Sequence, residues 1–355
     1  MTRRRVLIAP LDWGLGHATR CIPIIDELVK RGCEVSIASS GSALALLKKE
    51  HPRIRFFELP SYKATYSAQI PLMISVFLQL PKFLQAINRE HKQIEKIIAD
   101  QSIELVISDN RFGCWSKNVP SVFITHQTMI QMPWILKGLQ PIVNFFNHRF
   151  IKRFNYCWIP DFSGESNLTG KLSDSRTVPV KYIGILSRLK KIPSNVVYDL
   201  TIMLSGPEPQ RTILEKILLT QLKKSKCKAL LIRGVMEGES QWVKENELQI
   251  VNYLQRDEMA KIINQSQWII ARSGYSTIMD LAKLGKRAIF IPTPGQTEQE
   301  YLARRLKNYG IAFSMNQDNF NLSYAMEHSK GYKGFSNIEE GDDLLSQALT
   351  DVLEV

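Results

Sequence analysis

Short apolar runs alternate with amphipathic segments along the whole chain. The first run, Val6–Pro10, is followed by turn residues and then by Ala18–Arg31, whose apolar residues recur at helical spacing. This alternation is typical of βαβ units with a parallel sheet. Further strands are expected at 34–39, 53–59, 105–108, 121–125, 156–160, 199–204, 229–232, 248–253, 268–271 and 288–291. Helices are expected at 42–49, 81–100, 210–223, 257–264, 277–284, 298–307 and 338–353, and an irregular polar stretch at 316–337.

Two α/β series follow one another, separated by a polar stretch at 187–197. We therefore expect an α/β fold of two doubly wound, Rossmann-like domains, 1–187 and 188–337, facing a cleft, with 338–355 as a closing helix. A chain of 355 residues is long enough to bury two cores. Ligands of open α/β sheets bind outside the carboxyl ends of the strands, so the loops at those ends are the places to look for chemistry.

The charge balance limits the classes of partner. Lys and Arg exceed Asp and Glu by 12, yet no helix-turn-helix, RNP or zinc-finger pattern accompanies them, so no nucleic acid is expected. No apolar run approaches the length of a membrane-spanning helix, and the first run is too short for a signal peptide. The five cysteines are scattered, as in reduced proteins. We expect a cytoplasmic protein, free or peripheral on the inner face of a membrane.

The loop after the first strand contains Gly14, Gly16 and His17. A dinucleotide-binding fingerprint would require a third glycine where Thr19 stands, which disfavours a nicotinamide enzyme. His17 falls at the start of a helix, where the macrodipole disfavours its protonated form. A neutral imidazole suits a general base, whereas the alternative is a histidine that only caps or packs.

A second loop follows the strand 268–271 and contains Arg272 and Gly274, with Ser276 and Thr277 at a helix start. Free N–H groups at such a start form a site for a diphosphate, although an ordinary helix cap has the same pattern. Asp280 lies one turn further on, where a carboxylate can accept hydrogen bonds from vicinal hydroxyls. After the next strand, Gln299 and Glu300 open another helix, which could bind a sugar or be only solvated.

Together these residues resemble the GT-B glycosyltransferases, and within them the MurG-like family 28, which uses UDP-N-acetylglucosamine. The resemblance is strongest from Ile250 to Leu306. It implies a GT-B fold and the following donor contacts: Asp280 for the ribose, Ser276 and Thr277 for the phosphates, Gln299 and Glu300 for the sugar, the Leu254 backbone for the uracil, with Arg272, Gly274, Ser205 and Gly206 in the surrounding loops. The chain departs from the family pattern in three ways: Asp280 replaces a glutamate, Pro207 and Pro209 replace glycines, and the loop 292–299 is shorter.

The segment from Gly14 to Arg20 is also similar to the UDP-sugar hydrolases of the PseG type, as is Asp109-Asn110 after the strand 105–108. Apolar stretches at 73–80 and 132–154 weigh against hydrolysis. The second stretch is flanked by Lys137, His148, Arg149, Lys152 and Arg153. Basic amphipathic segments suit an anionic membrane and a lipid-linked acceptor, although core packing explains them equally well.

We therefore expect inverting transfer of a sugar, an N-acetylhexosamine, from a UDP-sugar to a hydroxyl of a membrane-associated or glycan acceptor, with His17 as base. The chain has no Asp-x-Asp motif, and Asp342-Asp343 falls on the closing helix as solvated charge, so neither a metal nor a cofactor is expected. UDP-sugar hydrolysis is one alternative. A non-catalytic protein that binds a sugar nucleotide or a lipid is the other.

Overall fold

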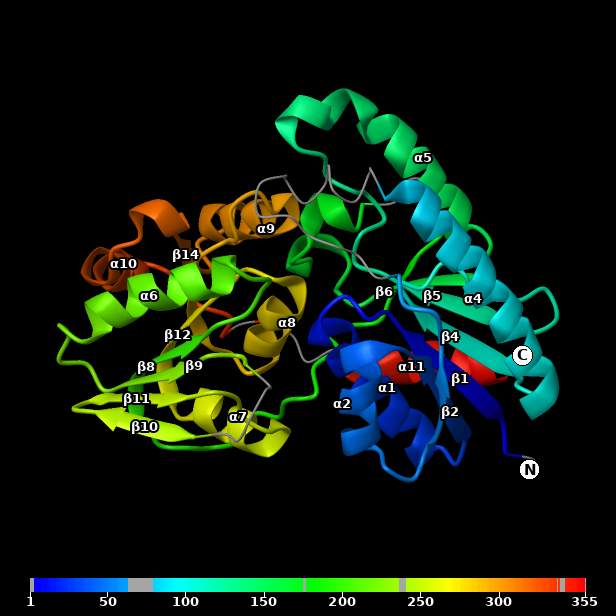
Figure 1. Ribbon diagram of the computed structural model, residues 1–355, viewed down its shortest axis with the longest axis horizontal. Helices are drawn as coiled ribbons and strands as arrows, with labels where there is room; N and C mark the ends of the chain where they lie inside the picture. The colour runs from blue at the N-terminus through cyan, green and yellow to red at the C-terminus, as the bar shows by residue number, and fades with distance from the viewer. Residues whose placement is uncertain are drawn as a thin grey trace. The chain divides into compact units, whose positions relative to one another are not determined.

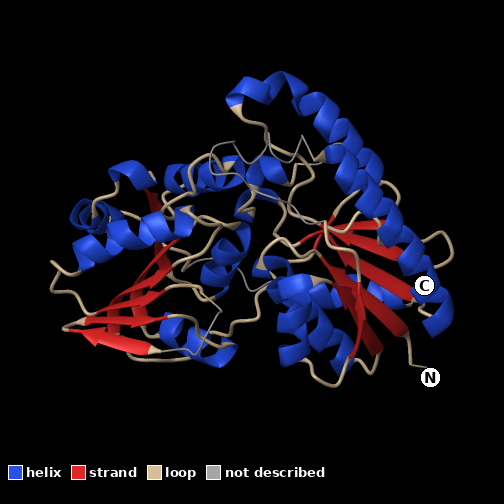
Figure 2. Ribbon diagram, in the orientation of Figure 1, coloured by secondary structure: helices blue, strands red, loops and turns tan. Residues whose placement is uncertain are grey.

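The computed structural model describes residues 3–62, 79–174, 177–235, 241–336, 338 and 342–354 (Figures 1 and 2). The described residues divide into two compact units. One contains the residues up to 187 together with the C-terminal helix, and the other contains 188–338.

The described part of the first unit contains a parallel sheet with the strand order β3-β2-β1-β4-β5-β6-β7. Its strands are β1 (Arg5–Pro10), β2 (Glu34–Ser39), β3 (Arg55–Glu58), β4 (Leu105–Asp109), β5 (Ser121–Ile124), β6 (Tyr156–Ile159) and β7 (Lys181–Tyr182). The central strands β1 and β4 are buried on both faces, which explains their continuous apolar runs. Their register pairs Pro10 with Asp109, so the loops that follow these strands begin side by side.

Helices cover both faces of this sheet (Figure 1). They are α1 (Leu15–Lys30), α2 (Gly41–Glu50), α4 (Leu80–Gln101), α5 (Gln140–Ile151) and α11 (Asp342–Leu353), with short 3-10 helices η1 (Trp134–Leu139), η2 (Gly164–Ser166) and η3 (Gly170–Leu172). Apolar residues of α1, α2 and α11 pack on one face of the sheet. Those of α4 pack on the other.

The second unit repeats this architecture with the strand order β10-β11-β9-β8-β12-β13-β14, parallel except for the β10–β11 pair. Its strands are β8 (Tyr198–Met203), β9 (Ala229–Ile232), β10 (Trp242–Glu245), β11 (Leu248–Val251), β12 (Ser266–Ala271), β13 (Arg287–Phe290) and β14 (Phe313–Ser314). Its helices are α6 (Gln210–Leu222), α7 (Arg256–Asn264), α8 (Tyr275–Lys283), α9 (Thr297–Asn308), α10 (Leu322–Ser329) and the 3-10 helix η4 (Gln317–Asn319). The neighbouring strands β8, β12 and β13 bring three of the four loops that were expected to bind the donor to one edge of the sheet.

The expected α/β fold with two parallel-sheet domains is confirmed, but the expectation of an irregular stretch at 316–337 is wrong. Helix α10 lies within it, because the Asn321 side chain caps the Tyr324 N–H at 2.9 Å and Leu322 and Ala325 place apolar side chains in the core. The expected closing helix 338–353 begins only at Asp342, and residues 337 and 339–341 lie outside the described ones. The short edge strands β7, β10 and β14 were not expected.

Candidate active site

The N-terminal candidate base is set by the turn between β1 and α1. Gly14 has φ +79, a conformation that suits glycine, and α1 begins at the next residue. The helix therefore starts earlier than expected, so that Gly16 and His17 both lie in its first turn. The His17 side chain is 14% exposed, so its ring is not fully enclosed by the protein.

Asp109, the last residue of β4, lies beside this histidine. Its Oδ1 is 3.1 Å from Nδ1 of His17, and its side chain is fully buried. A carboxylate cannot donate a hydrogen bond, so a hydrogen bond between these two atoms places the proton on Nδ1, whereas the Arg20 nitrogen 2.8 Å from the same Nδ1 can only donate and would need it unprotonated. The tautomer that donates to Asp109 leaves Nε2 unprotonated and able to accept a proton.

Arg20, one turn after His17 on α1, joins the group into a buried network. Its Nε donates to Oδ2 of Asp109 at 2.6 Å, and its second terminal nitrogen contacts Oδ1 of the same carboxylate and Nδ1 of His17. The remaining terminal nitrogen donates to Nδ1 of His126, in the loop after β5, at 3.1 Å. Arg20 and His126 are both buried, and neither was singled out from the sequence as a functional residue.

The electrostatics of the network favour a neutral base and an ionised partner. Burial lowers the pKa of His17, and the Arg20 charge lowers it further, while Asp109 offsets only part of the shift. Burial raises the pKa of Asp109, but the charges of Arg20 and His17 outweigh it and hold that pKa well below its usual range. At neutral pH the group therefore contains an uncharged imidazole oriented by a carboxylate.

A second buried ion pair supports the loop that follows Asp109. Nε of Arg111 donates to Oε1 of Glu90 on α4 at 2.5 Å, and both side chains are fully buried. The same guanidinium donates to the carbonyls of Pro10 and Pro60, at 3.3 and 2.7 Å. Arg111, which follows β4, thus connects the loop after that strand to the end of β1 through the Pro10 carbonyl. Sequence reasoning did not identify this pair.

In the second unit, the N-terminus of α8 has the properties of an anion site. Gly274 precedes the helix, which has no side-chain cap and no acidic residue in its first turn. Its φ of −71 suits any residue, and an added Cβ would meet no atom within 4 Å, so the glycine leaves space rather than making a strained turn. Ser276 and Thr277 follow in that first turn, half-buried, and Asp280 lies one turn on.

The loop after β8 completes this edge of the sheet. Gly206 has φ +103, so a glycine is required there. A Cβ built on it would lie 3.7 Å from the Thr293 hydroxyl, which is buried without a hydrogen-bond partner among the described residues. Ser205 is exposed beside it, and Leu254, after β11, is buried in the core.

Gln299 and Glu300, expected to contact a sugar, already hold the loop after β13. Oε1 of Gln299 accepts from the Thr293 N–H at 2.8 Å, and Oε1 of Glu300 accepts from the Gly295 N–H at 2.9 Å. The Gln299 NH₂ group and the second Glu300 oxygen remain for a ligand.

Arg272 lies underneath these loops rather than at their surface, with 1% of it exposed. Its guanidinium donates to the carbonyls of Ile291 and Pro292, each at 3.1 Å. It also donates to the Gln210 carbonyl at 2.9 Å and to Oε1 of Gln317 at 2.6 Å. The structure therefore makes Arg272 the residue that fixes the loops after β13 and β14 to the start of α6.

Two negative findings concern the described residues alone. Within residues 3–62, 79–174, 177–235, 241–336 and 342–354, no group of three or more His, Cys, Asp or Glu side chains is arranged to hold a metal ion. In the same part of the chain, no helix is long and apolar enough to cross a membrane.

The comparisons with known proteins agree with this architecture. Residues 210–328 match the glycosyltransferase family 28 C-terminal domain. The chain is 28% identical over 319 residues to the UDP-N-acetylglucosamine–N-acetylmuramyl-(pentapeptide) pyrophosphoryl-undecaprenol N-acetylglucosamine transferase of Haemophilus ducreyi, which covers 86% of this chain and 83% of that protein. It is 23% identical over 334 residues to an uncharacterized glycosyltransferase of Methanosarcina mazei, with 86% and 84% covered.

Solved structures share the fold at low sequence identity. MurG of Acinetobacter baumannii superposes with a TM-score of 0.61 at 12% identity, over 99% of this chain and all of that one. The calicheamicin glycosyltransferase CalG4 superposes with a TM-score of 0.66 at 11% identity, over all of this chain and 98% of that one. The fold and the matched domain define a GT-B glycosyltransferase. Within that class, the chain contains a family 28 C-terminal domain and is similar in fold to MurG of Acinetobacter baumannii.

Proposed function

We propose that the protein transfers a sugar from a UDP-sugar, an N-acetylhexosamine donor, to an acceptor hydroxyl with inversion at the anomeric carbon. The observation that carries the proposal is the His17–Asp109 pair, in which a neutral imidazole is oriented by a buried carboxylate. A neutral base held by a carboxylate is the arrangement that activates a hydroxyl in many transfer enzymes.

In the proposed reaction the acceptor oxygen attacks the anomeric carbon while Nε2 of His17 takes its proton. The bond from that carbon to the diphosphate oxygen breaks, and its electron pair leaves with UDP. Attack from the face opposite the leaving group inverts the configuration. The Nδ1–H of the resulting imidazolium donates a hydrogen bond to Asp109, which stays ionised.

The leaving diphosphate would be stabilised at the N-terminus of α8. Preorganised N–H groups at a helix start favour anions, and Ser276 and Thr277 add hydroxyl donors in the first turn. Asp280 would accept hydrogen bonds from the ribose, and the free atoms of Gln299 and Glu300 would contact the sugar. No metal or cofactor enters this scheme.

The experiment is a donor screen with UDP-sugars, with and without a membrane extract, that records both UDP release and sugar incorporation. We expect His17→Gln to lower turnover by about 10²–10⁴-fold, the usual loss for a general base. The affinity for UDP should stay within about twofold, because the N–H groups and hydroxyls that would hold UDP are intact. His328→Gln, an exposed histidine on α10, is the matched control. Full turnover by His17→Gln would reduce His17 to a structural residue.

The same screen separates transfer from hydrolysis. Hydrolysis has one structural observation in its favour: in the segment shared with UDP-sugar hydrolases, Arg20 contacts Asp109 directly. UDP release that is equal with and without acceptor, with no sugar incorporated, would assign water as the acceptor.

We further propose that the acceptor is lipid-linked and that the protein binds anionic membranes through the helix α5. The buried side of α5 is partly polar, since Asn144 hydrogen-bonds to the N–H and carbonyl of Ile130 and Asn147 donates to the carbonyls of Gln127 and Thr128. Several of its apolar residues face outward, with Phe145 63% exposed and Phe146 53% exposed, whereas Ile151 is buried, and Trp134 on η1 is 87% exposed. An exposed patch of large apolar side chains is typical of a surface that binds a partner or a membrane.

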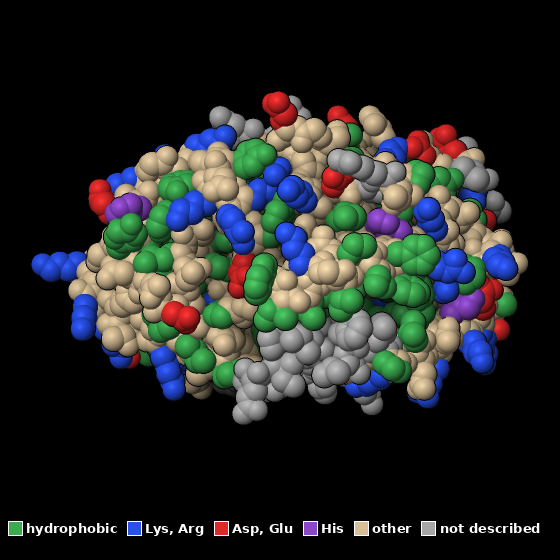
Figure 3. All heavy atoms as spheres, turned by 90° about the horizontal axis from the view of Figure 1, so that it is seen from above, with side chains coloured by type: hydrophobic (Ala, Val, Ile, Leu, Met, Phe, Trp, Pro, Cys, Tyr) green, Lys and Arg blue, Asp and Glu red, His purple; other side chains and the backbone are tan. Residues whose placement is uncertain are grey.

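Basic residues around this exposed apolar surface favour an anionic membrane as its binding partner. Lys137, Arg149, Lys152 and Arg153 are exposed around this apolar surface, and Figure 3 shows hydrophobic and basic side chains intermingled on this side of the first unit. Two residues of the expected patch do not belong to it: His148 bonds to Thr128 and Thr177, and Phe150 packs against Phe112. Of the expected segment 73–80, residues 73–78 lie outside the described ones.

Co-sedimentation with anionic and neutral vesicles tests this surface. Each basic residue near an anionic surface contributes roughly 1 kcal/mol, so binding to anionic vesicles should be reversible and weaken with salt. We expect Trp134→Ser and Arg149→Glu to reduce binding, whereas Trp242→Ser, an exposed tryptophan on β10, should not. Equal, negligible binding to both vesicle types would exclude a membrane role.

A further inference from the structure

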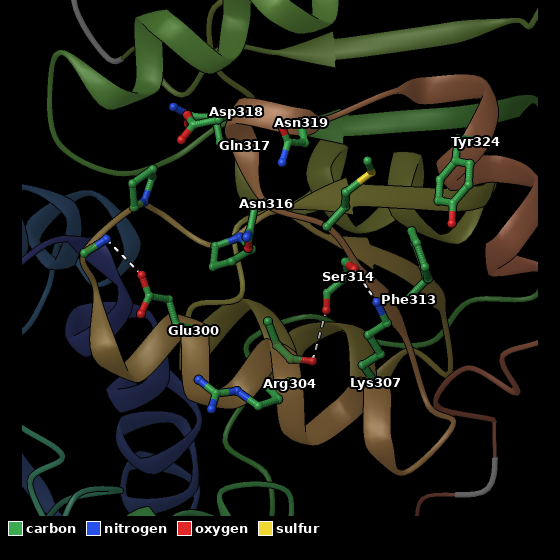
Figure 4. Close-up of a pocket in the computed structure, with 15 residues that line it drawn as sticks. Glu300, Arg304, Lys307, Phe313, Ser314, Asn316, Gln317, Asp318, Asn319 and Tyr324 are labelled. Carbon is green, nitrogen blue, oxygen red and sulfur yellow. Dashed lines mark hydrogen bonds between the residues drawn. The ribbon is translucent and has the colours of Figure 1, made fainter. Parts of the chain in front are cut away.

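A cavity of about 760 Å³ lies in the second unit between α9 and the segment that follows β14 (Figure 4). It opens beside the carboxyl ends of β13 and β14, the side of an α/β sheet on which ligands bind. Its volume falls in the range of sites for small ligands, about 300–1,000 Å³.

This cavity is distinct from the proposed nucleotide loops. Ser276, Thr277 and Asp280 do not line it, and the two places share Pro292, Pro294 and Gly295 of the loop after β13 together with Glu300, the proposed contact of the donor sugar. An occupant would therefore lie next to the proposed donor site without using its phosphate or ribose contacts.

The floor of the cavity is held in a fixed position by Gln317 of η4. This side chain is 3% exposed, accepts a hydrogen bond from Arg272 at 2.6 Å and donates one to Oε1 of Gln210 at 2.9 Å. Asn316 and Asn319 lie on the same anchored segment and line the cavity.

Several polar side chains that line the cavity have no hydrogen-bond partner among the described residues. Among the described residues, Asn316, Asp318, Asn319 and Arg304 form no side-chain hydrogen bond or ion pair, and Figure 4 shows them around the cavity. Amides both donate and accept, as sugar hydroxyls do. The lining contains two carboxylates, Asp318 and Glu300, and two cations, Arg304 and Lys307, and this balance of charge favours a neutral ligand over a strongly charged one.

An aromatic wall adds apolar contact area. Tyr324 on α10 is 49% exposed and stacks on His328 with their ring centroids 3.7 Å apart, and Phe313 lies beside it. Amide groups opposite an aromatic surface match the two sides of a sugar ring, its hydroxyl groups and its C–H face.

We propose that this cavity is a second carbohydrate site, which takes one neutral sugar unit through Asn316 and Asn319. The site is tested by sugar binding and not by turnover. It can therefore be confirmed or refuted independently of the proposed transfer reaction.

Saturation-transfer NMR of the whole chain tests the site, with N-acetylglucosamine and glucose as neutral probes and glucuronic acid as the anionic one. We expect a neutral sugar to bind with a dissociation constant of about 1–10 mM, as for a ligand with few contacts. The variant Asn316→Ala/Asn319→Ala should weaken this binding by about tenfold, the loss expected for two hydrogen bonds. Asn308→Ala, an exposed amide on α9 outside the cavity, should bind as the wild type does.

Competition with UDP-N-acetylglucosamine, whose sugar would occupy the proposed donor position at Glu300, separates this site from the donor site. Saturating UDP-N-acetylglucosamine should leave the neutral sugar bound, and the double variant should bind UDP normally. The proposal is overturned by any of four results: no binding of a neutral sugar, equal binding by the wild type and the double variant, displacement by UDP-N-acetylglucosamine, or binding of glucuronic acid alone. Both asparagines are exposed, so circular dichroism should show an unchanged fold in the double variant.

Discussion

Replacing Arg20 by Met tests the buried network beneath the proposed base. Methionine retains much of the apolar stem but removes the charge, which leaves the carboxylate of Asp109 buried without its main cation. Two unit charges about 4 Å apart attract by about 4 kcal/mol at an effective dielectric constant of about 20. Breaking a buried pair by removing one partner usually costs about 3–5 kcal/mol. We expect the free energy of unfolding at neutral pH to fall by about that amount.

The loss should depend on pH in a defined direction. Since the folded pKa of Asp109 is depressed, its stabilisation is present above the unfolded value of about 3.9 and is lost as pH falls below it. The stability difference between the wild type and Arg20→Met should therefore be largest at neutral pH and shrink below about pH 4.

His17 supplies an independent readout. Burial lowers its pKa and Arg20 lowers it further, so removing the guanidinium should raise that pKa. A folded histidine pKa below the unfolded value of about 6.5 means that stability falls as pH drops through 6.5, and this decline should be smaller in the variant. In the enzyme assay the acid limb of kcat/KM should move to higher pH.

Urea unfolding over a pH series and imidazole NMR titration measure both effects. Arg20→Lys, which keeps the charge without the planar fork, should lie between the wild type and Arg20→Met. Lys30→Met removes an 80% exposed cation from the same helix and should change stability by less than about 0.5 kcal/mol. If Arg20→Met unfolds like the wild type and His17 titrates unchanged, the network has no electrostatic role.

Two further variants test the supports of each unit. Asp280→Ala should weaken UDP binding by about 1.5–3 kcal/mol, the usual loss of hydrogen bonds to a charged group, and unchanged affinity in calorimetry would remove its ribose role. Glu90→Gln leaves Arg111 buried without a carboxylate and should lower the unfolding free energy by about 3–5 kcal/mol, with slower turnover because the loop of Asp109 loses its anchor. Wild-type stability in urea would contradict that assignment.

Local patterns predicted the fold and the loops well. The buried strands β1 and β12 and the glycines beside them are readable because strand burial and turn chemistry act over a few residues. The edge strands β10 and β14 were not readable, since a short strand is defined by the neighbour that it pairs with. Helix α10 was not predicted, because the polar composition of 316–337 indicated irregular structure more strongly than Asn321, its capping residue, indicated a helix start.

The charged network was predicted only in part, because burial of a charge is a tertiary property. Arg20 lies three residues after His17, on the same face of α1, and that spacing was an available signal. Glu90 lies between the buried Ile87 and Ile94 on α4, so a carboxylate on an apolar face pointed to a buried partner. Nothing local indicates that Arg111 is the partner, since the two meet only when β4 packs against α4.

Buried arginines fix the functional loops of both units, but their counter-charges differ. Arg20 and Arg111 each pair with a carboxylate inside the first unit. Arg272 forms no ion pair among the described residues: it donates to three carbonyls and one amide oxygen, its Nε has no partner there, and burial lowers its pKa to about 10. It therefore stays charged at neutral pH, beneath loops that meet the uncapped start of α8. A buried positive charge without an internal anion is expensive, and the four oxygen atoms that accept hydrogen bonds from Arg272 offset part of that cost.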